Sequence, residues 1–241
     1  MRDIIARHEV IALQFSGGKD SLACLYLLEE FWQKLHVVWG NTGDAFPETL
    51  ALIAEVRALV PHFIEVKSDV RAQQEKYGYP CDVLPVRNHP TVAMIIHPHE
   101  RPKLQSCFAC CRDNLWEPMQ QQMERMRATL IIRGQRTYEV QHSPVRSGDV
   151  INGVEYLFPI EDWSSERVRE YLGARLPEHY SYMDTGLDCQ HCTAHLFENI
   201  GKRRFTRERH PELHAELTRR LEVIAGEVEH EHAILREAIA A

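Results

Sequence analysis

The chain has 241 residues, of which 44% are hydrophobic and 26% charged, with a formal net charge of −7. This composition is typical of a globular domain and excludes a largely disordered chain. The acidic balance argues against a protein that coats nucleic acid through bulk charge. Asp3, Arg7 and Glu9 interrupt the N-terminus, so no signal peptide is predicted. No apolar run reaches about 18 residues, so we expect no membrane span and a cytoplasmic protein.

The predicted elements of the first part of the chain alternate between strands and helices. Residues 9–15 form an apolar run that predicts a buried strand. Leucines at three- and four-residue steps then predict a helix over 20–34. A strand at 35–41, a helix at 46–60 and a strand at 62–69 follow. This alternation predicts an α/β fold, a doubly wound and mainly parallel sheet with helices on both faces.

The second half of the chain continues the pattern after an irregular stretch at 71–106. Two further helices and two further strands are predicted, at 110–127, 165–172, 128–136 and 156–160. A short hairpin is expected at Ser147–Asp149, and Ser164 is expected to cap the helix that follows it. The last residues predict charged helices broken near His210. We therefore expect one domain over 1–194 and a helical C-terminal extension over 195–241.

A glycine-rich loop joins the first predicted strand to the first predicted helix. It reads Ser16-Gly17-Gly18-Lys19-Asp20-Ser21. Glycine lets the backbone approach an anion closely, and the N–H groups at the start of a helix attract phosphate. The spacing differs from that of a Walker A loop. A tight turn with incidental polar residues is the alternative, and we favour phosphate binding because all six residues suit it.

The loop resembles the PP-loop of the adenine-nucleotide α-hydrolase superfamily. That superfamily includes ATP pyrophosphatases, which adenylylate a substrate, and the phosphoadenylyl-sulfate (PAPS) and adenylyl-sulfate (APS) reductases. Residues 41–49 (NTGDAFPET), 133–136 (RGQR) and 158–163 (FPIEDW) are similar to further motifs of the PAPS reductase-like branch. The resemblance covers residues 9–194 and implies a site for ATP or an adenylyl-sulfate.

The resemblance also implies which residues bind and act on the nucleotide. The binding set comprises the six loop residues together with Asn41, Thr42, Gly43, Arg133, Gly134 and Arg136. Asn41 to Gly43 end a predicted strand beside the loop, where doubly wound sheets bind ligands. The alternative for the arginines is a solvated turn. The catalytic candidates are Lys19, Asp20, Arg136 and Cys107.

Five of the seven cysteines fall in two clusters. The first contains Cys107, Cys110 and Cys111, and the second contains Cys189 and Cys192. Since disulfides are disfavoured in the cytoplasm, clustered cysteines there indicate metal binding or catalysis. Four thiolates suit either a zinc ion or a [4Fe–4S] cluster. Buried cysteines that pack as small hydrophobic residues are the alternative.

The APS reductases provide a choice between the two metals. They resemble this chain in carrying a Cys-Cys pair followed much later by a Cys-x-x-Cys pair, and there the four bind a [4Fe–4S] cluster. The resemblance implies a [4Fe–4S] cluster on Cys110, Cys111, Cys189 and Cys192, with zinc as the alternative. Cys107 is then an alternative ligand or a free thiol. Cys24 and Cys81 are expected to be structural, although Cys81 is also a candidate thiol.

One departure from the reductase pattern bears on the reaction. Reductases carry a nucleophilic cysteine in a C-terminal Glu-Cys-Gly-Leu-His segment, whereas here no cysteine follows Cys192. We therefore predict ATP-dependent activation of a substrate with pyrophosphate release and Mg²⁺, followed by sulfur transfer from a sulfur donor. One alternative is an APS or PAPS reductase that uses Cys81 or Cys107 with a thioredoxin-like partner. Another is a non-catalytic nucleotide-binding subunit of a complex.

The C-terminal extension suggests two kinds of partner. Lysine and arginine are frequent over residues 202–220, which could guide a nucleic acid. A solvated helix whose charges are balanced by glutamates is the alternative. Leucines and an isoleucine recur on one helical stripe at 213–224, which suits a packing face or a homodimer contact.

Overall fold

A six-stranded sheet forms the centre of the protein. The computed structural model describes residues 1–96, 101–137, 144–197 and 200–241. The strands follow the order β3-β2-β1-β6-β8-β7, and only β7 and β8 pair antiparallel. In chain order they are β1 (Ile11–Gln14), β2 (Leu35–Asn41), β3 (Phe63–Lys67), β6 (Leu130–Ile132), β7 (Val150–Ile151) and β8 (Val154–Leu157). The mainly parallel sheet predicted from the sequence is confirmed.

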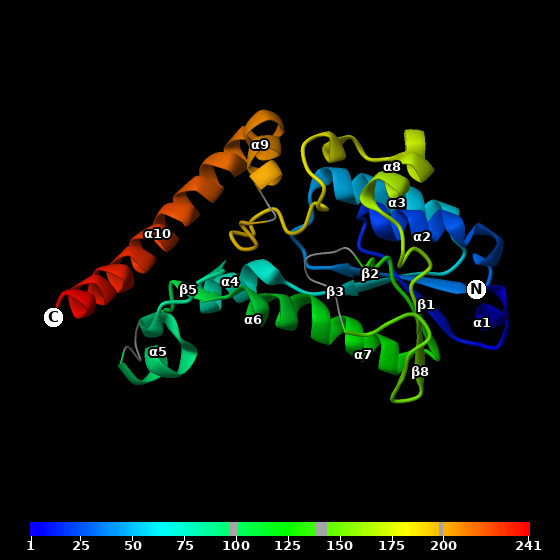
Figure 1. Ribbon diagram of the computed structural model, residues 1–241, viewed down its shortest axis with the longest axis horizontal. Helices are drawn as coiled ribbons and strands as arrows, with labels where there is room; N and C mark the ends of the chain where they lie inside the picture. The colour runs from blue at the N-terminus through cyan, green and yellow to red at the C-terminus, as the bar shows by residue number, and fades with distance from the viewer. Residues whose placement is uncertain (97–100, 138–143, 198–199) are drawn as a thin grey trace.

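Helices cover both faces of this sheet (Figure 1). One face carries α2 (Lys19–Leu27), α3 (Pro47–Leu59) and α8 (Ser165–Leu172), and the other carries α6 (Cys107–Cys111) and α7 (Glu117–Arg125). Successive side chains of a strand point to opposite faces. Accordingly, Leu13 packs in the same cluster as Leu22 of α2, whereas Ala12 packs with Met123 of α7. The sheet is therefore buried on both sides, as parallel sheets generally are.

The strand order reverses between β1 and β6. The chain runs from β1 outward through β2 and β3, and then returns to place β6 on the other side of β1. Such a reversal opens a crevice at the carboxyl ends of the two strands, where doubly wound sheets bind ligands. The loop at 16–18 follows β1 and the turn at 133–136 follows β6. Both predicted nucleotide motifs therefore lie at this crevice.

A smaller layer carries the first cysteine cluster. It consists of two parallel strands, β4 (Tyr79–Cys81) and β5 (Leu104–Ser106), with α4 (Val70–Tyr77) before them and α5 (Pro90–Ile96) between them. Cys81 and Leu104 pack against Ile224 of the long C-terminal helix. Since α6 begins directly after β5, this layer positions the cysteines of α6.

Two helices form the C-terminal extension. They are α9 (Ile200–Arg209) and α10 (Pro211–Ala240), and the predicted break at His210 is confirmed. Pro211 stands at the first position of α10, where a missing N–H costs no helical hydrogen bond. Figure 1 shows α10 extending from α9 past the β4–β5 layer to the C-terminus. Among the described residues no helix combines the length and apolar character that a membrane span requires.

Several local expectations differ from the structure. The helix predicted over 20–34 ends at Leu27 and is followed by a 3-10 turn, η1 (Glu29–Phe31). The hairpin turns at Asn152-Gly153 rather than at 147–149, because both residues adopt the positive φ that a tight hairpin turn demands. Helix α1 (Arg2–Ala6) was not predicted. Further short turns are η2 (Val86–Asn88), η4 (Gly173–Arg175), η5 (Glu178–Ser181) and a π-helical turn, η3 (Arg112–Trp116).

Candidate functional site

The glycine-rich loop is held in shape by its own serines. Gly17 has a φ of +82°, a conformation that glycine adopts at little cost. Ser16 Oγ accepts the N–H of Gly18 at 3.2 Å. Ser21 Oγ donates to the carbonyl of Gly18 at 2.9 Å and lies 3.1 Å from Ser16 Oγ. These hydrogen bonds preorganise the loop, which lowers the cost of binding a ligand.

Two cations meet one carboxylate at the start of α2. Lys19 is only 2% exposed, and its Nζ donates to Asp20 Oδ2 at 3.1 Å. Arg136, which is also buried, places its Nε 2.8 Å from Asp20 Oδ1. Together with the N–H groups of the helix start, this arrangement suits a polyphosphate.

Gly134 lies directly against the loop, whereas Arg133 does not. A Cβ at Gly134 would lie 2.5 Å from the carbonyl carbon of Asp20, so only glycine fits there. Arg133 instead donates from Nε to Gln14 Oε1 at 2.6 Å, and its guanidinium lies 5.4 Å from the centre of the Tyr156 ring. Burial lowers the pKa of Arg133. Its predicted contact with a nucleotide stays a prediction.

The segment after α8 supplies two contacts that sequence reasoning missed. The hydroxyl of Tyr180, a buried residue, accepts the N–H of Lys19 at 2.6 Å. The carbonyl of Asp184 accepts from Lys19 Nζ at 2.9 Å. The Asp184 carboxylate is held by Arg169, which lowers its pKa. No local pattern in the sequence signals these contacts, because the partners lie 161 and 165 positions apart.

The loop after β2 joins the nucleotide motif to the second cysteine cluster. Gly43 has a φ of +79°, and its N–H donates to Asn41 Oδ1 at 2.9 Å. Thr42 Oγ1 lies 3.2 Å from Cys189 Sγ. Asp44, which is 3% exposed, accepts the backbone N–H of His191 at 2.9 Å, and its other carboxylate oxygen lies 2.7 Å from His191 Nδ1. Asp44 was not among the predicted site residues.

The four cysteines predicted to bind a cluster lie near enough to one another for their ionised thiols to interact. Cys110 is buried on α6, and Cys111, Cys189 and Cys192 are half-buried. Burial, together with repulsion from Cys189 and Cys192, raises the pKa of Cys110 to about 12. Burial and repulsion from Cys192 and Cys110 likewise raise the pKa of Cys111 to about 12. Because these thiols repel one another when ionised, a positively charged iron centre among them would relieve the repulsion.

These cysteines do not form a site that would hold a single metal ion. Among the described residues, no three His, Cys, Asp or Glu side chains are arranged to hold one metal ion. The π-helical turn η3 follows α6 directly, and π-helical turns are frequent at functional sites. From this turn, Asn114 donates to the carbonyl of Cys110 at 2.9 Å. The turn thereby steadies the end of α6 that carries the Cys-Cys pair.

The remaining cysteines lie around this set. Cys107 is buried and interacts electrostatically with Cys111 and with Cys81. Cys81 donates to the carbonyl of Gln105 at 3.3 Å, and burial raises its pKa to about 11. Cys24 is fully buried in α2, which confirms that it belongs to the core.

The basic stretch at 202–220 divides into inward- and outward-facing residues. Lys202 and Arg220 are buried, and they donate to the carbonyls of Cys189 and His191 at 2.7 and 3.2 Å. Arg204 and Arg207 are exposed. Part of this positive charge therefore lies against the loop that carries Cys189 and Cys192. Nucleic-acid binding by the exposed arginines stays a prediction.

Comparisons with known proteins identify the family and the fold. The model of the phosphoadenosine phosphosulfate reductase domain family matches residues 10–207. A PAPS reductase from Candida auris, solved as a phosphate complex, superposes with a TM-score of 0.55 at 14% identity, covering 79% of this chain and 86% of that one. A predicted tRNA methyltransferase subunit from Methanocaldococcus jannaschii has a TM-score of 0.36 at 14% identity, covering 83% of this chain and 87% of that one. No curated protein sequence matches. The family match over most of the chain establishes that it belongs to the phosphoadenosine phosphosulfate reductase domain family.

Proposed function

We propose that the protein binds ATP at the glycine-rich loop, activates an acceptor with release of pyrophosphate, and transfers sulfur to it beside an iron–sulfur cluster. One observation carries the proposal. Thr42 of the nucleotide motif lies 3.2 Å from the sulfur of Cys189. The nucleotide motif therefore contacts one of the four cysteines Cys110, Cys111, Cys189 and Cys192, which we call the thiol set. Sulfur chemistry on an activated intermediate requires such adjacency, because the reacting groups must meet without diffusion.

The residues of the loop suit the activation step. An oxygen of the acceptor attacks the α-phosphorus of ATP, the bond to the bridging oxygen breaks, and pyrophosphate leaves. Lys19 and Arg136 stabilise the negative charge on the leaving group. Asp20 orients both cations. Mg²⁺ bound to the polyphosphate would neutralise the pyrophosphate that leaves. A sulfur donor then displaces AMP from the acceptor.

The thiol set suits an iron–sulfur cluster. Cys110, Cys111, Cys189 and Cys192 provide four thiolates, the ligands that such clusters take. When bound, the cluster would supply a soft metal centre with affinity for sulfur. Thr42 and Asn114 lie against two of the four cysteines and position them.

The structure supports sulfur transfer over sulfonucleotide reduction. A reductase needs a thiolate that attacks the sulfur of the substrate. The other candidate thiols, Cys81 and Cys107, are only 2% and 4% exposed. Burial raises the pKa of both thiols, which disfavours the reactive thiolate.

The test uses protein purified without oxygen. Its iron and acid-labile sulfide are measured first. Pyrophosphate release from ATP, with total small RNA or a protein-free metabolite extract as the source of acceptor, is then compared with sulfite release from APS and PAPS plus thioredoxin. We expect a full cluster and pyrophosphate without sulfite. Lys19→Met should lower the rate of pyrophosphate release at least about 100-fold, whereas Lys34→Met, just before the amino end of β2, should not. Sulfite release would establish the reductase instead, and nucleotide binding without turnover would indicate a non-catalytic subunit.

A further inference from the structure

Lys202 is a buried charge without a carboxylate partner in the described parts of the chain. It is 2% exposed, and its Nζ donates to the carbonyl of Cys189 at 2.7 Å. The same Nζ lies 5.5 Å from the centre of the Phe46 ring. A carbonyl and an aromatic face are neutral, and a buried charge is costly unless a counter-charge accompanies it. The position of Lys202 therefore needs a further explanation.

The residue before Lys202 packs closely against the segment that precedes the loop with Cys189 and Cys192. A Cβ on the preceding residue, Gly201, would lie 2.5 Å from both Met183 Cβ and the carbonyl oxygen of Tyr182, so glycine permits the close approach of α9. Lys202 is the third residue of α9. The N-terminal end of a helix disfavours cations, because its partial charge is positive. Neither the helix nor an ion pair among the described residues accounts for the buried ammonium.

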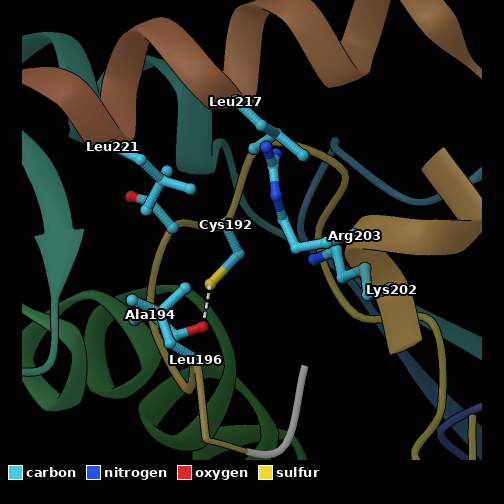
Figure 2. A pocket seen from close by; sticks show the side chains of 8 residues that line it. Cys192, Ala194, Leu196, Lys202, Arg203, Leu217 and Leu221 are labelled. Carbon is cyan, nitrogen blue, oxygen red and sulfur yellow. Dashed lines mark hydrogen bonds between the residues drawn. The ribbon is translucent and has the colours of Figure 1, made fainter. Parts of the chain in front are cut away.

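A second cation stands next to it. Lys202, Arg203 and Cys192 line a cavity of about 10 Å³, roughly the size of one water molecule (Figure 2). Arg203 donates from Nη2 to Thr218 Oγ1 at 2.8 Å, while its buried Nη1 finds no acceptor in the part of the chain that the structure describes. Lys202 therefore lies at this cavity beside Cys192, whereas Arg203 reaches Thr218 of α10.

We infer that Lys202 is the counter-charge of the iron–sulfur centre on Cys110, Cys111, Cys189 and Cys192, and that it sets the reduction potential of that centre. The inference rests on the proposed function, because it requires the cluster. Four thiolates bring four negative charges to one place, and the buried ammonium offsets part of them. Since reduction adds one electron, a neighbouring positive charge favours the reduced form.

The test measures the midpoint potential of the cluster by a redox titration followed by EPR. Lys202→Met keeps the length of the side chain and removes its charge. We expect the reduction equilibrium to fall at least about tenfold, which for a one-electron couple is a shift of 59 mV to lower potential. Lys202→Arg should retain most of the wild-type value. Lys34→Met is the matched control, because it removes an exposed lysine just before the amino end of β2.

The outcomes separate this inference from the proposed function. Wild-type protein that contains no iron would overturn both. Wild-type protein with a cluster, and a Lys202→Met potential equal to that of Lys34→Met, would overturn the inference alone. If Lys202→Met loses its iron, the iron content of two further variants is measured instead of the potential. We then expect Lys202→Arg to keep its iron and Lys202→Gln to lose it. Equal retention by those two variants would overturn the inference.

Discussion

Replacing Gly134 with alanine tests whether the turn after β6 sets the shape of the phosphate loop. The added Cβ would lie 2.5 Å from the carbonyl carbon of Asp20 and 2.6 Å from the backbone nitrogen of Ser21. Ordinary carbon contacts begin at about 3.5 Å, so one backbone segment must move by about 1 Å. Both neighbours are backbone atoms, which cannot turn aside as a flexible side chain can.

Two measurable losses follow from this displacement. Overpacking of this kind costs about 1–3 kcal/mol of the free energy of unfolding. The displaced loop also carries Lys19 and the N–H groups of the helix start. A misplacement of about 1 Å in a positioning element can reduce catalytic rate about 100-fold. We therefore expect weaker ATP binding as well as lower stability.

The assay combines urea denaturation with calorimetric titration of ATP. Gly226→Ala in α10 is the matched control, because a Cβ there would meet nothing within 4 Å. That variant should gain about 0.5–1 kcal/mol from the helical preference of alanine over glycine. The reasoning is refuted if Gly134→Ala unfolds and binds ATP as the wild type does, since the turn would then not contact the loop as the structure has it.

Three further predictions concern the loop, the thiols and the sheet. Lys19→Met should lower the rate of pyrophosphate release about 100- to 1000-fold, and near-wild-type turnover would contradict its role at the phosphates. Cys110→Ser should lose most of its iron, whereas Cys107→Ser should keep it. The reason is that, among the contacts described, only Cys110 interacts with both Cys189 and Cys192. Equal iron contents of the two variants would indicate that Cys107 is also a ligand. Arg7 and His8 hold the pKa of Glu155 below its ordinary value of 4.5. The unfolded chain therefore binds more protons than the folded chain, and stability is lost as the pH falls through the folded pKa of Glu155. Glu155→Gln should cost about 1 kcal/mol at neutral pH and flatten the pH dependence of urea unfolding between about pH 3 and pH 5, and an unchanged slope would count against the ion pair.

The inward-facing charges of the C-terminal extension change how that segment is understood. Its basic residues could be assigned to a nucleic-acid partner from their frequency alone. In the structure, Lys202 and Arg220 are instead buried, and both donate to carbonyls of the loop that carries Cys189 and Cys192. The extension therefore supports the thiol set directly, and a nucleic-acid surface would have to use the exposed arginines.

The sequence by itself determined the fold class and most elements of the central sheet, but not α1 or the elements of the stretch at 71–106. Apolar runs and helical spacing are local properties, so strands such as Ile11–Gln14 and the break at His210 were predictable from a short window. The glycine-rich loop and the paired cysteines were likewise visible, because close spacing along the chain already brings those groups together. The placement of the glycine-rich loop and the turn at 133–136 at one crevice followed from the general rule that ligands bind at the carboxyl ends of parallel strands.

Only the tertiary structure decided which distant side chains meet. Tyr180 reaches the N–H of Lys19 across 161 positions, and Asp44 holds His191 across 147. Lys202 of α9 reaches the carbonyl of Cys189, and Gly201 lets the same helix approach Tyr182 and Met183 closely. Such contacts depend on how whole elements pack rather than on any periodicity within them. The sequence shows the charge of a side chain, and the packing of the folded chain decides what that charge faces.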